Sequence, residues 1–167
     1  MRVVIQRVAE AGVDVVGREI ARIGRGLLLL VGIEKGDGEG EIAFMADKVL
    51  HLRVFADEAG RMNLDVRQVR GGVLSVSQFT LAARNRKGRR PDFTHAEEPG
   101  RARELYERFN SLLRDVVPVA AGEFGAMMQV RSVNDGPVTI ILEKTGDEPG
   151  CLRSAAAKGG SVVTRNA

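Results

Sequence analysis

The sequence predicts an α+β domain, with a mostly antiparallel β-structure and two main helices. Two patterns support this prediction. Short apolar and β-branched segments, bounded by glycines, recur along the chain, and two longer segments carry the helical period. The 167 residues, 44% of them hydrophobic, suffice for one domain with a real core.

The first third of the chain has the pattern of strands. Residues 2–8 form a β-branched run, and Gly17-Arg18 separates the apolar positions at 13–15 from those at 20–23, as in a hairpin. Residues 27–33 are apolar almost without interruption, which predicts a central strand.

Two segments predict amphipathic helices. Within residues 39–52 the apolar side chains recur at i, i+3, i+4, i+7 and i+8, and they are Ile42, Met45, Ala46, Val49 and Leu50. A second helix is expected from about residue 101 to 114. Its buried stripe would consist of Leu105, Phe109, Leu112 and Leu113.

Glycine residues and polar segments mark the boundaries of the remaining elements. A short strand at 53–56 is followed by a turn at 58–61, and Gly71-Gly72 announces a firm strand over 73–79. Residues 82–98 are polar and basic, which predicts a long loop.

The end of the chain is expected to hold two strands and a tail. The strands cover 126–133 and 138–143, with a turn at 134–137 between them. A change to Gly, Ala and Ser after Lys144 predicts a domain over 1–145 and a flexible tail over 146–167.

The composition argues against several classes of function. One cysteine and two histidines are too few for a disulfide, a cysteine cluster or most histidine metal sites, so we expect no metal and no cofactor. Motifs for phosphate loops, dinucleotide binding and zinc proteolysis are missing. No signal peptide or membrane-length apolar run occurs, and we expect a cytoplasmic protein.

Two polar strand ends are candidate sites. The first contains Ser77, Gln78, Phe79 and Thr80. Its hydroxyls could simply cap backbone groups. Thr80 could instead act as a nucleophile, although no base lies nearby in the sequence. In a third reading, backbone N–H groups around Phe79 and Thr80 stabilise an oxyanion.

The second polar strand end contains Gly136 and Pro137, which are ordinary residues for a turn. If the peptide bond between them is cis, it becomes a deliberate feature whose carbonyl groups could hold an ammonium group. The sequence leaves both isomers open.

A basic cluster follows the first candidate site within a few residues. Five cations lie in seven positions, namely Arg84, Arg86, Lys87, Arg89 and Arg90. Such a cluster attracts phosphate, and a solvated loop is the alternative.

Six segments, in order and at natural spacing, resemble the D-aminoacyl-tRNA deacylase (D-tyrosyl-tRNA deacylase) family over residues 1–144. They are MRVVIQRV, GLLLLVGIEKGD, RMNLDV, VLSVSQFTL, RKGRRPDF and FGAMMQVRSVNDGPVTIILE. The resemblance implies a β-barrel-like sheet with the helices packed outside, a homodimer, and no metal or organic cofactor.

The resemblance also implies a reaction. The enzyme would hydrolyse the ester between a D-amino acid and the 3′-terminal ribose of tRNA, a chiral proofreading step in translation. Glycyl-tRNA is an expected second substrate. The substrate's own ribose 2′-hydroxyl would assist, and backbone groups would stabilise the oxyanion.

Site residues follow from the same resemblance. Residues Ser77 to Thr80 would line the pocket for the terminal adenosine and the acyl group, with Met128 packed near it. Gly136 and Pro137, as a Gly-cisPro motif, would reach into the partner subunit's site and reject L-amino acids. Arg7 would lie near that motif.

Two rival functions remain at this point. A non-catalytic RNA-binding module could keep the basic loop and lose both motifs, yet both are intact here. A related deacylase that edits L-alanine would carry a trans Gly-Pro with altered flanking residues, and the context of Arg7 and NDGPVT favours the D-specific form.

Overall fold

The structure, a computed structural model, describes residues 1–84 and 89–144. Its elements, in chain order, are β1 Arg2–Val15, β2 Arg18–Ile23, β3 Gly26–Gly32, α1 Glu39–Leu50, β4 Phe55–Ala56, β5 Met62–Leu64, β6 Gly72–Ser77, the 3₁₀ helix η1 Phe79–Ala82, α2 Pro99–Arg114, β7 Val119–Ala121 and β8 Met128–Glu143. The expected tail over 146–167 lies outside the described residues.

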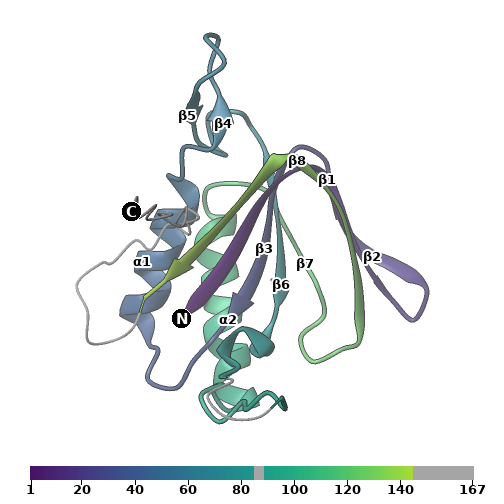
Figure 1. Ribbon diagram of the computed structural model, residues 1–167, viewed down its shortest axis with the longest axis vertical. Helices are drawn as coiled ribbons and strands as arrows, with labels where there is room; N and C mark the ends of the chain where they lie inside the picture. The colour runs from purple at the N-terminus through teal and green to yellow at the C-terminus, as the bar shows by residue number, and fades with distance from the viewer. Residues whose placement is uncertain (85–88, 145–167) are drawn as a thin grey trace, which may run out of the picture.

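Six strands form one mixed, curled sheet, and β4 and β5 form a separate hairpin (Figure 1). The order is β2-β1-β3-β6-β7, and β8 also pairs with β1. The pairs that β1 makes with β2, β3 and β8 are antiparallel, whereas β3–β6 and β6–β7 are parallel. This nearly closed, barrel-like sheet with two helices confirms the expected fold class.

Strand β3 is central, as its apolar run predicts, and it separates two clusters of the core. Leu27 and Leu29 pack with both helices, because helices α1 and α2 cover that side of the sheet (Figure 1). Leu28 points the other way and packs with residues of β1, β2 and β6 inside the curl of the sheet. The alternation of a strand thus fills both layers.

The two helices match their predicted stripes. The five residues expected on the buried face of α1 are buried, and the Gly38 backbone N–H at its start donates a hydrogen bond to the Glu41 carboxylate at 3.1 Å. Helix α2 begins at Pro99, two residues earlier than expected, because proline suits the first helical position. Leu105, Phe109 and Leu113 are buried, and Leu112 is half-buried against the core.

The first hairpin exists as predicted, but its turn lies one residue earlier than the expected Gly17-Arg18. Strands β1 and β2 are joined by Val16 and Gly17, whose φ angles of 50° and 73° are both positive. This geometry suits a two-residue connection between twisted strands. Strands β5 and β7 were not expected from the sequence, because each is only three residues long.

Two predicted boundaries are wrong. Strand β6 ends at Ser77, not at residue 79, because Gln78 N–H bonds to the Val31 carbonyl and the chain turns into η1. The expected turn over 134–137 does not reverse the chain, since strand β8 continues through it and both halves of β8 pair with β1. The register shifts on either side of Val8, so the segment forms a bulge.

No helix in the described part of the chain has the length and hydropathy to span a membrane.

Candidate functional site

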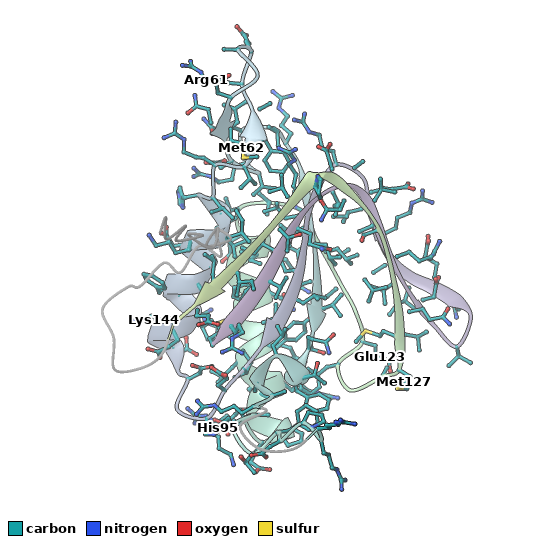
Figure 2. The ribbon with its side chains drawn as sticks, viewed as in Figure 1. Arg61, Met62, His95, Glu123, Met127 and Lys144 are labelled. Carbon is teal, nitrogen blue, oxygen red and sulfur yellow. The ribbon has the colours of Figure 1, made fainter. Side chains whose placement is uncertain are left out.

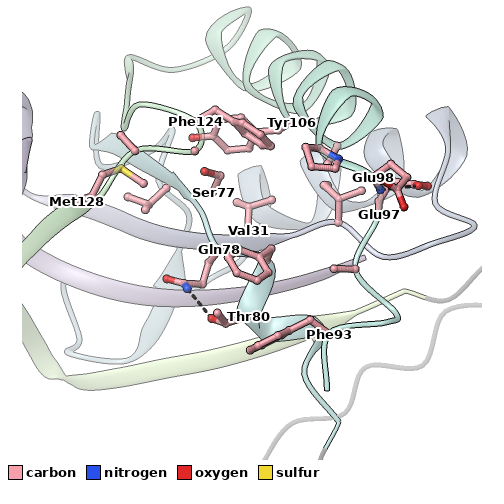
Figure 3. Close-up of a pocket in the computed structure, with 18 of the residues that line it drawn as sticks. Val31, Ser77, Gln78, Thr80, Phe93, Glu97, Glu98, Tyr106, Phe124 and Met128 are labelled. Carbon is pink, nitrogen blue, oxygen red and sulfur yellow. Dashed lines mark hydrogen bonds between the residues drawn. The ribbon is translucent and has the colours of Figure 1, made fainter. Parts of the chain in front are cut away.

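A pocket of about 980 Å³ lies at the carboxyl end of β6, where the chain turns into η1 (Figure 3). Residues 77–80, called the SQFT turn here, line it together with Val31 of β3 and Tyr106 of α2. Residues 124–128, called the far wall, close another side. Residues of the segment 92–98 also line it, so the pocket joins five separate parts of the chain around the first candidate site.

The SQFT turn is positioned by the neighbouring strand. Gln78 donates its backbone N–H to Val31 O at 2.7 Å, and Leu81 N–H returns to Gln78 O at 3.2 Å. Gly32 leaves room for this turn, because a Cβ there would lie 2.9 Å from Leu81 Cβ and 3.1 Å from Gln78 O. A glycine in β3 is thus required for the close approach of η1.

Backbone N–H groups are available in the turn. The first amides of a helix have no acceptor within it. Among the residues that the structure describes, the N–H groups of Phe79 and Thr80 donate to no other group. Both residues are exposed at the pocket, so these two donors can bind an anionic oxygen of a ligand.

The hydroxyl of Thr80 is not activated. Its Oγ1 accepts a hydrogen bond from the Gln78 amide at 2.5 Å (Figure 3), and an amide N–H is not a base. Among the described residues, no His, Asp, Glu or Lys side chain has a hydrogen bond with Thr80 Oγ1 through which it could act as a base.

The two ends of the pocket differ in chemistry. Met128 and Phe124 lie at one end, and Glu97 and Glu98 lie at the other (Figure 3). The Glu97 side chain is only 10% exposed, and it accepts the Glu98 backbone N–H at 2.9 Å. Glu97 also forms an ion pair with Arg101 at 3.4 Å, which partly balances its charge. Such a pocket suits a ligand with an apolar part and a part that donates hydrogen bonds.

Aromatic residues frame the pocket. Phe79 is 60% exposed and meets Phe93 edge to face, with ring centroids 5.2 Å apart. The ring centroids of Tyr106 and Phe124 lie 5.9 Å apart, and the Tyr106 hydroxyl donates a hydrogen bond to Ser75 O at 2.9 Å. Burial raises the pKa of the Tyr106 hydroxyl, which keeps it a donor at neutral pH.

The described residues of the expected loop, 82–84 and 89–98, contact one another and the end of β3. Arg84 and Asp92 form an isolated antiparallel bridge, and Glu97 N–H bonds to Ile33 O. Hydrogen bonds from Thr94 lower the pKa of Asp92, which keeps its carboxylate ionised. Sequence reasoning missed Phe93, Glu97, Tyr106 and Phe124 as pocket residues, since only the fold brings them to the SQFT turn.

The second candidate site lies elsewhere in the same chain. Gly136 and Pro137 are exposed in the β8 bulge, and the peptide bond between them is cis. Neither lines the pocket. Met128 begins β8 beside the pocket, and Gly136 lies eight positions further along this strand, on the order of 25 Å of extended chain. One chain therefore does not bring the two motifs together.

Arg7 organises the bulge. Its Nε donates to Asp135 O at 2.9 Å, and its Nη1 donates to Val54 O at 2.5 Å. A Cβ added to Gly136 would lie 3.0 Å from Arg7 Nη2 and 2.8 Å from Val138 Cγ2. Gly136 also has a φ of 138°, so the bulge requires glycine there.

The predicted basic cluster is described only in part. Arg84, Arg89 and Arg90 are exposed. Arg86 and Lys87 lie outside the described residues. Within residues 1–84 and 89–144, no group of three His, Cys, Asp or Glu side chains could hold a metal ion.

The chain is similar to known proteins over nearly all of the residues that the structure describes. A family model described as D-Tyr-tRNA(Tyr) deacylase matches residues 4–143. A Geobacter sulfurreducens protein named D-aminoacyl-tRNA deacylase is 54% identical over 144 residues, which cover 86% of this chain and 95% of that protein. One from Brevibacillus brevis with the same name is also 54% identical, over 86% of this chain and 99% of its own length.

Two solved structures are also similar. The c-Myc DNA Unwinding Element Binding Protein superposes with a TM-score of 0.83 at 43% identity, over 87% of this chain and 99% of that one. A probable eukaryotic D-amino acid tRNA deacylase gives a TM-score of 0.73 over 84% of this chain and 97% of its own. The second likeness, at 18% identity, concerns the fold alone.

Proposed function

Because this chain belongs to the D-Tyr-tRNA(Tyr) deacylase family and is a hydrolase of the D-aminoacyl-tRNA ester, we propose that the ester carbonyl binds at the SQFT turn. The observation that carries this proposal is a pair of backbone N–H groups, those of Phe79 and Thr80: both residues line the pocket, and neither N–H has an acceptor among the described residues. They would stabilise the oxyanion that forms when the carbonyl is attacked.

The substrate would supply the group that the protein lacks. Water adds to the ester carbonyl carbon, the carbon–oxygen bond to the ribose 3′-oxygen breaks, and that oxygen leaves with a proton. We assign the proton transfer to the neighbouring ribose 2′-hydroxyl, because Thr80 Oγ1 has an amide as its partner and not a base. The protein then contributes orientation and electrostatic stabilisation.

Chiral selection would come from a second subunit. Gly136 and Pro137 are exposed and distant from the pocket of their own chain, as they must be to enter the pocket of a partner. There the motif would leave no space for the side chain of an L-amino acid, and a steric clash discriminates more strongly than a lost contact. Glycine has no side chain to clash, so glycyl-tRNA would also be cleaved.

A homodimer is consistent with the exposed apolar side chains. Met127, labelled in Figure 2, is 92% exposed and directly precedes β8. Val133 and Val130, in the first half of β8, are 52% and 38% exposed. Phe79 at the pocket is also exposed. A second copy of the chain that covers these residues would remove apolar surface from water while completing the site.

The tRNA backbone would contact the basic cluster. Arg84, Arg89 and Arg90 follow the SQFT turn and are exposed, so they are free to meet phosphates near the 3′ end. Such contacts give affinity without sequence information. The cytoplasm, where aminoacyl-tRNA is consumed, would be the place of action.

One assay tests this function. The protein is incubated with D-tyrosyl-, L-tyrosyl- and glycyl-tRNA, with and without a chelator. We expect the D-ester and the glycyl ester to be hydrolysed, the L-ester to persist, and the chelator to have no effect. Hydrolysis of the L-ester at a comparable rate, or loss of activity with the chelator, would contradict the proposal.

A further inference from the structure

A single backbone carbonyl connects the two sides of the pocket. Ser75 O, in the fully buried middle of β6, accepts two hydrogen bonds of 2.9 Å, one from the Tyr106 hydroxyl and one from Gly122 N–H. Ser75 lies two residues before the SQFT turn, and Gly122 lies two residues before the far wall. Both sides of the pocket are therefore fixed to the same atom.

Tyr106 adds the third element to this junction. It belongs to α2, is buried, and presents its ring to the pocket beside Phe124 of the far wall. Its hydroxyl ties the helix to β6, whereas the strand pairing of Ser75 with β3 and β7 does not involve the helix. Without the hydroxyl, the ring has packing but no directional bond to hold it.

We propose that Tyr106 is a positioning residue for ester hydrolysis: through Ser75 O, its hydroxyl fixes the SQFT turn relative to the far wall and α2. This inference rests on the proposed function, in which the Phe79 and Thr80 amides bind the ester carbonyl. Tyr106 would fix the distance between these amides and the far wall of the same pocket. A displacement near 1 Å at such a site is sufficient to lower the rate about 100-fold.

The variant Tyr106→Phe tests the inference. It keeps the ring against Phe124, and Ser75 O keeps its bond to Gly122 N–H, so this carbonyl is not left without a donor and the chain should fold. We expect kcat for D-tyrosyl-tRNA, per folded molecule, to fall about tenfold while KM stays within about twofold. Circular dichroism gives the folded fraction used for this normalisation.

Phe109→Leu is the matched control. Phe109 lies on the same helix and is completely buried in the core, but it does not line the pocket. We expect this variant to melt at a lower temperature than the wild type and to keep its kcat per folded molecule. An equal drop of kcat in both variants would mean that Tyr106 acts only through stability, and would overturn the inference.

The remaining outcomes separate the two proposals. If the wild type hydrolyses D-tyrosyl-tRNA and Tyr106→Phe does so equally fast, the positioning role is wrong and the proposed function stands. If the wild type itself does not hydrolyse the D-ester, the proposed function is wrong and the inference falls with it.

Discussion

Gly32 gives a direct test of the idea that backbone geometry at the SQFT turn governs activity. In Gly32→Ala, the new Cβ would lie 2.9 Å from Leu81 Cβ and 3.1 Å from Gln78 O. Carbon atoms normally meet at about 3.5–4.0 Å, so η1 must move away by roughly 0.6–1 Å. The neighbours are the base of a side chain and a backbone oxygen, which cannot rotate out of the way.

This displacement should affect rate more than stability. Overpacking of this kind costs about 1–3 kcal/mol in the free energy of unfolding. Misplacement of the Phe79 and Thr80 amides by almost 1 Å should lower kcat about 10- to 100-fold. Urea titration measures the first quantity, and single-turnover hydrolysis of D-tyrosyl-tRNA measures the second.

Gly40→Ala is the matched control for this prediction. Gly40 is in α1, and a Cβ there would meet nothing within 4 Å, so the variant should be as active and at least as stable as the wild type. Gly32→Ala with an unchanged kcat would refute the reasoning, because the turn would then tolerate the displacement on which the oxyanion hypothesis depends.

Three other predictions follow from single contacts. Thr80→Ala should keep kcat within about threefold, because its hydroxyl has no base; loss of activity with normal tRNA binding would make Thr80 the nucleophile. Arg7→Ala removes the bonds that hold Asp135 and Val54, so hydrolysis of L-tyrosyl-tRNA should rise about tenfold, while an unchanged D/L ratio would argue against its role. The Arg67 guanidinium lowers the pKa of Asp65, so the ionised carboxylate stabilises the folded chain. This contribution is present above a pH of about 4 and disappears as the pH falls through the lowered pKa. In Asp65→Asn, the free energy of unfolding measured with urea should therefore depend less on pH on the acid side.

The local parts of the fold were predictable from the sequence. The 3.6-residue period of Ile42, Met45 and Val49 identifies α1 because one face of that helix is buried against a sheet. The uninterrupted apolar run of β3 likewise identifies a strand with both faces covered. These signals survive in sequence because each depends on a pattern within a single element.

The composition of Asn134 to Pro137 misled the prediction for a physical reason. Asn, Asp, Gly and Pro favour turns locally, but β1 is long enough to pair with both halves of β8 and hold the segment as a bulge. Tertiary pairing therefore overrides the local preference. The bulge is also where Arg7 anchors, a contact between residues 128 positions apart.

The pocket was predictable only where it is local. The SQFT turn stands out in sequence because polar residues follow a buried strand. Phe93, Tyr106 and Phe124 carry no such mark, since aromatic residues in a loop or on a helix face are ordinary core residues. Long-range packing of β6 against α2 and the far wall places them at the site.

The central claim is that each active site combines the SQFT turn of one subunit with Gly136 and Pro137 of the other. A heterodimer of Gly32→Ala and Gly136→Ala subunits tests it. The amino group of Met1 is buried against Asp37 and Lys144 O, so the two purification tags belong at the carboxyl end. In this heterodimer the Gly32→Ala subunit has an altered SQFT turn and an intact bulge. The Gly136→Ala subunit has an intact SQFT turn and an altered bulge.

The measurement is the D/L ratio for tyrosyl-tRNA hydrolysis by this heterodimer, compared with the Gly136→Ala homodimer. If selection occurs across the interface, the intact bulge of the Gly32→Ala subunit enters the intact pocket of its partner. The heterodimer then hydrolyses the D-ester at about half the wild-type rate and does not hydrolyse the L-ester. If the heterodimer cleaves the L-ester as readily as the Gly136→Ala homodimer does, selection occurs within one subunit and the composite site is wrong.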